Sequence, residues 1–249
     1  LLALVLAAFV LIEMGWPLLA GLVGAVATAT RPNSLPLVPS LLLFELLRSG
    51  AVAASAVDPT SIPWWRPDRR VVLHLGRMRP AQWSVLVSVM GVVAYSWWLR
   101  GHAGDPLYWL HDQSYYGHGS VLSPSTWFKS LFLDDPRYVV TNGLWATNEV
   151  LTGCVVIAAV LLTPTVWRRF GAAYGTFVAG VVAIAWVAPR GMAPGARYLL
   201  PALPFFAIVA AEWLAPRRRV LVPLLAWFGA AGFLAVTAFV ASNGTWLEW

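Results

Sequence analysis

The sequence predicts an all-α membrane protein, a polytopic bundle of about eight short transmembrane helices. Apolar residue types make up 59% of the 249 residues and charged types only 11%, whereas a soluble domain carries about 25% charged residues. The mean hydropathy is +0.69. Many of the 15 tryptophans stand at the ends of apolar runs, as in the aromatic belts of membrane interfaces.

The apolar runs give the order of the predicted membrane segments. A backbone in lipid must satisfy its own hydrogen bonds, so these runs are expected to be helices. The runs cover residues 1–12, 17–30, 34–48, 82–99, 149–165, 172–189, 198–214 and 220–240. We interpret 1–249 as a single transmembrane domain.

The first run begins without a methionine and without the basic n-region of a signal peptide. We therefore expect residues 1–12 to be the later part of a hydrophobic segment, and the chain to be the C-terminal part of a longer protein.

The second and third runs are interrupted by "TRPNSLP", residues 30–36. Pro32 and Pro36 break helical hydrogen bonding and push the residue before each of them out of helical geometry. Arg31 stands in this interruption. Since broken helices are tolerated in a bilayer only beside protein or a water-filled cavity, the pattern predicts a functional helix break.

Basic loops set the predicted orientation. The loop 49–81 holds five arginines against two aspartates, and "WRR" at 167–169 and "PRRR" at 216–219 are also basic. Cytoplasmic loops are enriched in Lys and Arg, so these three loops are predicted to be cytoplasmic. Because the basic residues are split among short loops and form no single face, we exclude nucleic-acid binding.

Strict alternation then places the segment 100–148 outside, together with Arg31, Arg190 and Arg197. A guanidinium can bind a phosphate through two parallel hydrogen bonds, and lipid head groups supply phosphate at a membrane face. A snorkelling anchor is the alternative for any one of them. Arg31 and Arg197 lie beside Pro- or Gly-punctuated breaks, which favours a functional site; Arg190 is the weaker candidate.

The outer segment 100–148 combines aromatics with turn signals such as Gly-Asp-Pro and Ser-Pro, which predicts short interfacial helices. The spacing of His102, His111 and His118 matches no standard zinc pattern. We expect no metal and no cofactor, with a divalent cation left open.

The remaining polar signals are few. The acidic residues Glu13, Glu45 and Glu212 lie near the predicted cytoplasmic ends and are expected to be solvated. Cys154 is the single cysteine, so an internal disulfide is excluded. Arginine supplies all but one of the 17 basic residues. Together with abundant alanine, this is typical of a GC-rich bacterial genome and hence of a bacterial plasma membrane.

Three blocks carry a resemblance: "ATATRPNSLPLVPSLLL", "HDQSYYGHGS" and "GARYLLPALPFFAIVAAEWL". They resemble blocks of the PIG-V-type mannosyltransferases and their bacterial relatives, which belong to the GT-C superfamily of polytopic glycosyltransferases. The matching residues are Arg31, Pro32, Gln113, Tyr115, Tyr116, Gly117, Arg197, Tyr198 and Pro201.

The resemblance implies a GT-C-like fold and transfer of a hexose, typically mannose, from a polyprenyl-phosphate donor on the non-cytoplasmic side. The acceptor can be a glycolipid, a polysaccharide or a protein. The family's catalytic acid lies in the first outer loop, which would precede residue 1, so we assign no catalytic residue and expect the 249 residues alone to be inactive. The substrate-binding residues that the resemblance implies are Arg31, Gln113, Tyr115, Tyr116, Arg197 and Tyr198, and Arg190 is added from its predicted place on the outer side.

Two other functions stay open at this point. A transporter or flippase of a lipid-linked sugar could also have outer-face arginines and broken helices. It would be expected to show repeats between its halves, and the sequence shows none. A non-catalytic membrane subunit is the third alternative.

Overall fold

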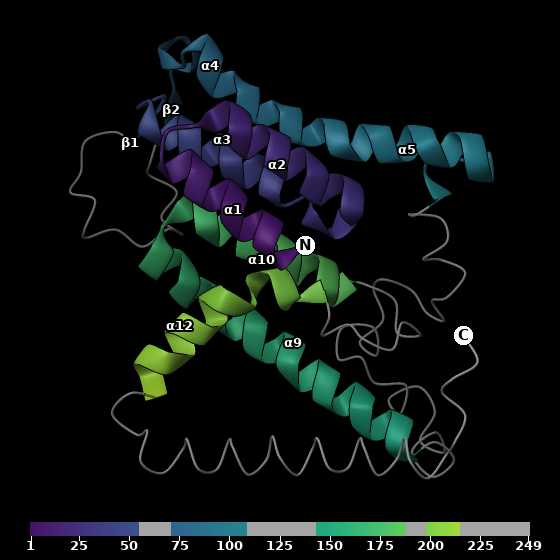
Figure 1. Cartoon of the computed structure of the whole chain (residues 1–249). Helices are drawn as coiled ribbons and strands as arrows, with labels where there is room; N and C mark the ends of the chain where they lie inside the picture. The colour runs from purple at the N-terminus through teal and green to yellow at the C-terminus, as the bar shows by residue number, and fades with distance from the viewer. Residues whose placement is uncertain (55–70, 109–142, 188–197, 215–249) are drawn as a thin grey trace. The chain divides into compact units, whose positions relative to one another are not determined.

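The computed structural model describes residues 1–54, 71–108, 143–187 and 198–214 (Figure 1). Nearly all of these residues are helical, as the sequence predicts. The helices of the first half are α1 (Leu2–Glu13), α2 (Pro17–Thr30), η1 (Pro32–Ser34), α3 (Leu37–Arg48), η2 (Leu75–Arg77), α4 (Pro80–Trp83), η3 (Ser84–Val89) and α5 (Met90–Ala103). Those of the second half are α9 (Gly143–Phe170), α10 (Ala172–Val187), η5 (Leu200–Ala202) and α12 (Leu203–Leu214).

Contacts divide the chain into two units, Leu1–Phe206 and Ala207–Trp249. The first unit holds every contact and cavity considered below. The described part of the second unit is the remainder of α12, up to Leu214.

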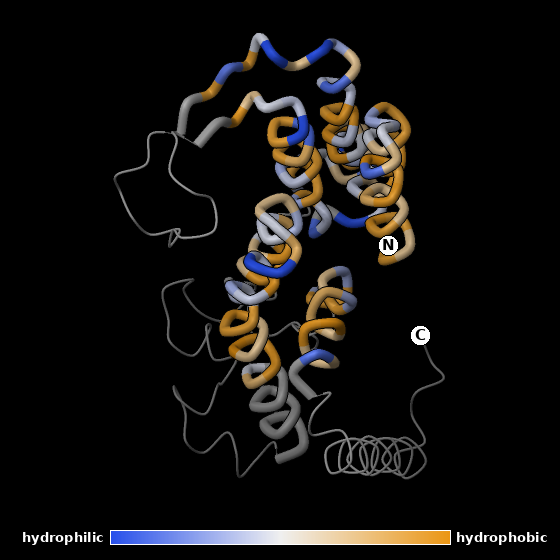
Figure 2. Tube along the Cα trace, turned by 90° about the vertical axis from the view of Figure 1, so that its left-hand side faces the viewer, coloured by the Kyte–Doolittle hydropathy of each residue, from blue (hydrophilic) through white to orange (hydrophobic). Residues whose placement is uncertain are grey.

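The predicted runs up to residue 214 coincide with these helices, while the run 220–240 lies outside the described residues. In the described part, two helices are long and apolar enough to cross a membrane, Pro80–Ala103 and Gly153–Phe170. The others are apolar but shorter, which gives most of the helical trace its hydrophobic colour (Figure 2). A helix of 12 residues such as α1 is about 18 Å long, whereas the hydrocarbon core of a bilayer is about 30 Å thick.

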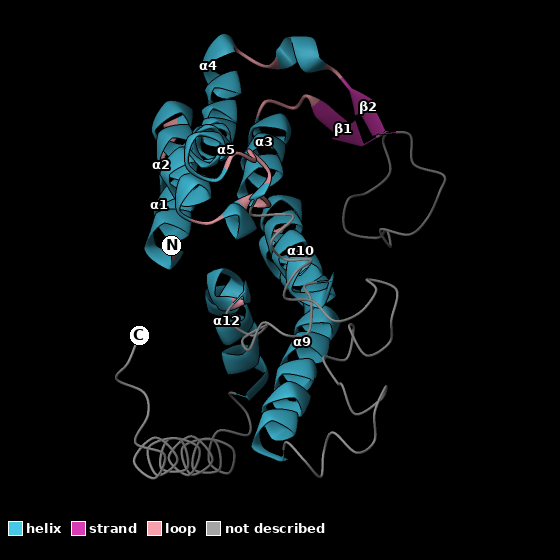
Figure 3. Ribbon diagram, turned by 90° about the vertical axis from the view of Figure 1, so that its right-hand side faces the viewer, coloured by secondary structure: helices cyan, strands magenta, loops and turns pink. Residues whose placement is uncertain are grey.

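The predicted cytoplasmic loop 49–81 contains a small element that the sequence analysis did not predict. Strands β1 (Val52–Ala54) and β2 (Val71–Leu73) form an antiparallel pair (Figure 3). Val52 is opposite Leu73, and Ala54 is opposite Val71. Each strand is only three residues long, so its alternation is too short to be read from the sequence.

Helix α9 is longer than predicted. The sequence indicated 149–165, whereas the helix runs from Gly143 to Phe170 and continues through Pro164. The last residues of the predicted outer segment are therefore helical. Hydropathy underestimates the length of such a helix because the residues at its ends are polar. A proline inside a helix is tolerated more readily in membrane proteins.

Helix α2 packs closely against η3 and α5 through small residues. A Cβ added at Gly91 would lie 1.8 Å from the carbonyl oxygen of Ala25, so the two backbones approach as closely as glycine allows. In the same contact the hydroxyl of Thr28 donates a hydrogen bond to the carbonyl of Ser88 at 2.7 Å. Such small-residue contacts are typical of helix pairs in membranes.

Aromatic side chains join α1, α10 and the start of α12. Phe177 is fully buried, and the ring of Phe9 lies 5.4 Å from it and 6.0 Å from the ring of Phe205, centroid to centroid. The hydroxyl of Ser40 donates to the carbonyl of Ala173 at 2.6 Å, which fastens α3 to α10. These contacts hold the ends of α1, α3 and α10 next to one another.

Candidate functional site

The predicted helix break at Arg31 is present. Helix α2 ends at Thr30, and Arg31 has extended backbone angles, φ −152° and ψ 121°, because the following Pro32 disfavours helical geometry there. The Arg31 amide donates to the carbonyl of Ala27 at 3.2 Å, and its carbonyl accepts from the Ser34 amide at 3.0 Å. The break therefore satisfies its own backbone.

The Arg31 side chain is exposed. Within the described ranges, its guanidinium makes no hydrogen bond and no ion pair. All five of its N–H donors are thus available to a ligand on the surface of this end of α2. We call this end, with Arg31 and η1, the arginine break.

An apolar groove begins four residues beyond Arg31. Its volume is about 580 Å³, and it runs between the start of α3 and α10. It is lined by Leu35, Pro36, Pro39, Trp167, Thr176, Ala179, Gly180, Ala183 and Ile184. At Gly180 an added Cβ would lie 2.5 Å from the Pro36 side chain, so the absent side chain allows this close approach. The groove therefore begins close to Arg31 along the chain, although Arg31 is not among the described residues that line it.

Of the other predicted substrate-binding residues, Tyr198 is described and is buried, with 6% of its surface exposed. The predicted residues Gln113, Tyr115, Tyr116, Arg190 and Arg197 lie outside the described residues.

Of the three histidines in the outer segment, His102 is described. It is exposed, its Nδ1 lies 2.9 Å from the carbonyl oxygen of Trp98, and its ring stacks on the Trp98 ring at 4.3 Å. His111 and His118 lie outside the described ranges. Among the described residues, no group of three or more His, Cys, Asp or Glu side chains gathers as a metal ion would need.

At the opposite end of α2, the structure corrects one prediction. Glu45 was expected to be solvated, but only 1% of it is exposed. Gln82 donates its side-chain N–H to Glu45 Oε2 at 2.8 Å. The second oxygen, Oε1, lies 3.8 Å from Nη1 of Arg48, which is an ion pair but too long for a hydrogen bond. No donor among the described residues hydrogen-bonds to Oε1.

The reason for the burial is the helix face on which Glu45 lies. It follows Leu37 and Leu41 at intervals of four residues, and all three are buried. Residues four apart share one face of an α-helix, so Glu45 belongs to the stripe that packs inward. This periodicity was the signal that could have revealed a buried carboxyl group.

Arginines surround this carboxyl group. Arg48 donates to the carbonyl of Ile12 at 3.0 Å and so caps the C-terminal end of α1, where a cation is favourable. Arg77 donates to the carbonyl of Gly50 at 3.1 Å. They line a polar cavity of about 480 Å³, which we call the Glu45 cavity. Its lining residues are Gly15, Pro17, Glu45, Arg48, Ser49, Arg77, Arg79, Ala81 and Gln82.

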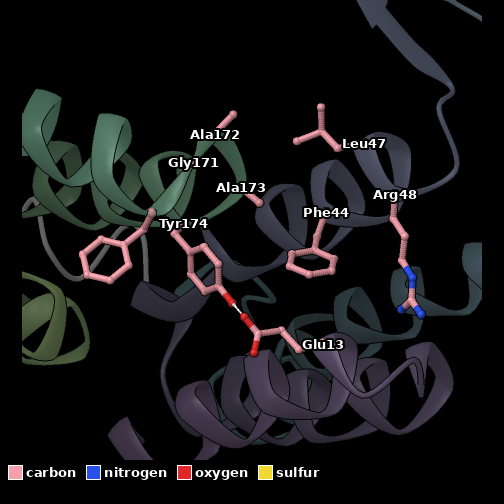
Figure 4. Close-up of a pocket in the computed structure, with 9 residues that line it drawn as sticks. Glu13, Phe44, Leu47, Arg48, Gly171, Ala172, Ala173 and Tyr174 are labelled. Atoms are coloured by element: carbon pink, nitrogen blue, oxygen red, sulfur yellow. Dashed lines mark hydrogen bonds between the residues drawn. The ribbon is translucent and has the colours of Figure 1, made fainter. Parts of the chain in front are cut away.

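A second cavity at this end lies beside Glu13 (Figure 4). The hydroxyl of Tyr174 donates to the Glu13 carboxyl group, and the rings of Phe44 and Tyr174 are 6.2 Å apart. The cavity has a volume of about 520 Å³ and is mostly apolar. Glu13 is exposed, as predicted, but it is paired across helices. Arg48 lines this cavity as well as the Glu45 cavity.

No protein-family model matches the chain, and no curated protein and no solved structure matches it significantly. The arginine break presents an exposed cationic group four residues before an apolar groove begins. The Glu45 cavity presents several cationic groups around a buried acceptor.

Proposed function

We propose that the protein is a membrane glycosyltransferase with about eight membrane segments. It would move a hexose, mannose by the family resemblance, from a polyprenyl-phosphate donor to an acceptor hydroxyl on the non-cytoplasmic face of a bacterial plasma membrane. One observation carries this proposal. The exposed Arg31 is followed four residues later by Leu35, the first residue of an apolar groove, and the donor likewise joins a phosphate head to an apolar tail.

The groove suits the donor's tail. Its lining is almost entirely apolar, and a polyprenyl chain gains free energy for each unit of apolar area that it removes from water. The tail would lie against Leu35 and Pro36 while the phosphate remains within reach of Arg31. The sequence order supports this arrangement, because only three residues separate Arg31 from the first residue of the groove.

The chemistry of transfer assigns the arginine a role. The acceptor hydroxyl loses its proton to a base and forms a bond to the anomeric carbon, while the bond from that carbon to the phosphate oxygen breaks. The leaving phosphate retains the electron pair and gains negative charge. A guanidinium placed at that oxygen stabilises the charge as it develops, and its planar fork matches two phosphate oxygens. We assign this role to Arg31, with Arg197 as its predicted companion.

The test is sugar transfer by the full-length protein in membranes supplied with labelled polyprenyl-phosphate mannose. Arg31→Ala and Arg31→Lys are compared with wild type at equal protein amounts. Loss of a charge-assisted contact weakens binding or rate by roughly 10- to 100-fold. Lysine retains the charge but lacks the two-pronged geometry, so both variants are expected to be impaired. Arg197→Ala and Arg197→Lys are expected to behave in the same way.

The matched control is Arg100→Ala, which removes an exposed arginine from the last turn of α5. It should leave transfer unchanged. If Arg31→Lys is fully active and Arg31→Ala is only less abundant, the arginine is a membrane anchor and the assignment is wrong. If wild-type membranes move the lipid-linked sugar across the bilayer without transferring it, the protein is a transporter.

A further inference from the structure

The Glu45 cavity and the arginine break lie at opposite ends of α2. Pro17, the first residue of the helix, lines the cavity, whereas Arg31 follows the last residue. A helix of 14 residues separates the two by about 21 Å. One ligand head cannot therefore occupy both sites, and the cavity needs its own explanation.

The first requirement of the cavity is an anion. Among the described residues, Arg48, Arg77 and Arg79 line it together with one acidic residue, Glu45. Each guanidinium has five N–H donors. Among the described residues, Arg48 and Arg77 each donate one hydrogen bond to a backbone carbonyl, so most of their donors remain for a ligand. A phosphate, with several acceptor oxygens, is the group that such clustered arginines recognise.

The second requirement is a hydrogen-bond donor. Glu45 Oε1 is buried, and no donor in the described part of the chain hydrogen-bonds to it. Gln82 donates one of its two amide N–H groups to Oε2, its carbonyl oxygen accepts from the Arg79 amide at 2.8 Å, and its amide makes no hydrogen bond to Oε1. A buried acceptor without a donor is costly. A ligand that fits therefore carries an N–H or O–H group a few atoms from its phosphate.

The third requirement is an apolar tail. A groove of about 410 Å³ shares Pro17 and Ala81 with the Glu45 cavity. Its other lining residues are Trp16, Leu18, Leu19 and Ser84. Leu18 and Leu19 are exposed, so their apolar surface is available to a hydrocarbon chain.

The surroundings favour a lipid over free phosphate. Trp16 and Trp83 are both exposed near this end, and exposed tryptophans beside arginines are typical of a membrane interface. We propose that the Glu45 cavity and its groove bind a phospholipid whose headgroup carries an ammonium or hydroxyl donor beside the phosphate. The phosphate lies among the arginines, the donor bonds to Glu45 Oε1, and an acyl chain follows the groove. This site is independent of the proposed sugar transfer.

The test compares two lipids that differ only in the substituents on the headgroup nitrogen. Phosphatidylethanolamine and phosphatidylcholine have the same phosphate and can have the same acyl chains, but the choline group has no N–H. Binding of each lipid to the full-length protein in detergent is measured by native mass spectrometry over a range of lipid concentrations. We expect phosphatidylethanolamine to bind about tenfold more tightly, the effect of one hydrogen bond to a charged group.

Two variants separate the roles of the head-binding residues. Arg79→Ala removes an exposed guanidinium from the cavity and should weaken both lipids by roughly tenfold or more. Glu45→Gln can still accept from Gln82, so it keeps that contact, but it loses the free acceptor. It should bring phosphatidylethanolamine down to the level of phosphatidylcholine. The control Arg100→Ala removes the same charge at the other end of the helix Pro80–Ala103 and should change neither affinity.

Several outcomes would overturn the inference. Equal affinities of the two lipids for wild type would remove the role of Glu45. Unchanged binding by Arg79→Ala and by a second variant, Arg77→Ala, would remove the role of the arginines. Inorganic phosphate that competes at the same concentration as the lipid would make this a site for free phosphate. Stronger competition by a polyprenyl phosphate would assign it to the donor lipid.

Discussion

The charged residues at the two ends of α2 differ in their exposure and in their side-chain partners. At the arginine break, Arg31 is exposed and its side chain makes no hydrogen bond or ion pair among the described residues, while its backbone N–H and carbonyl are both bonded. At the Glu45 cavity, the carboxyl group is buried and bonded to Gln82. The comparison shows that residue type alone does not determine whether a charged side chain near a helix end is exposed or buried. The position of the residue on the helix determines this.

The largest expected effect concerns the side of the membrane on which each end lies. Gly76 and Gly101 are exposed, and nothing lies within 4 Å of a Cβ added to either. In a Cys154→Ser background, Gly101→Cys should react with a membrane-impermeant maleimide in intact cells. Gly76→Cys should react only after the inner face has been opened. Each signal is expected to be all-or-none, since the bilayer separates the two positions.

The opposite labelling result would contradict the predicted orientation of the two ends of α2. If Gly76→Cys reacts in intact cells while Gly101→Cys does not, the orientation taken from the basic loops is wrong. The arginine break would then face the cytoplasm, and a donor on the non-cytoplasmic side could not reach it.

The next largest effect is expected at the half of α2 that leads to the arginine break. Gly91→Ala would place a methyl group 1.8 Å from the Ala25 carbonyl oxygen and 2.3 Å from Thr28 Oγ1, so the helices must separate. Overpacking of this kind costs about 1–3 kcal/mol and occasionally more. Thermal unfolding of the detergent-solubilised protein should show a clear fall in midpoint.

The control for this prediction is Gly101→Ala in the same helix. Its added methyl group meets nothing within 4 Å, and alanine favours a helix over glycine by about 1 kcal/mol. Gly101→Ala should therefore be neutral or slightly stabilising. Equal midpoints for both variants would contradict the close packing of α2 against α5.

The smallest effect is expected at the Glu13 cavity. Tyr174→Phe removes the hydrogen bond to Glu13 but keeps the ring that packs against Phe9 at 4.6 Å. Because Glu13 is exposed and can be solvated instead, the loss should be about 0.5–1 kcal/mol in the free energy of unfolding.

A matched comparison is Phe177→Ala, which empties the fully buried centre of the same aromatic group and should cost about 3–5 kcal/mol. A Tyr174→Phe loss as large as that of Phe177→Ala would mean that the pair with Glu13, and not aromatic packing, holds α1 against α10.

The sequence by itself determined the all-helical class, the order of the described helices and the break at Arg31. These features are local in origin. Apolar runs form helices wherever the backbone must bond to itself, and Pro32 acts on the residue directly before it. The prediction of an available guanidinium at Arg31 followed from the same local pattern.

Only the tertiary structure decided the burial of Glu45 and the two cavities beside it. Gln82, which bonds to Glu45, is 37 residues away along the chain, and no local pattern shows which distant segment will cover a helix face. The strand pair β1–β2 likewise depends on residues that pair although they are far apart in the sequence. Such features arise from contacts between remote segments, since burial depends on what packs against a side chain and not on its own chemistry.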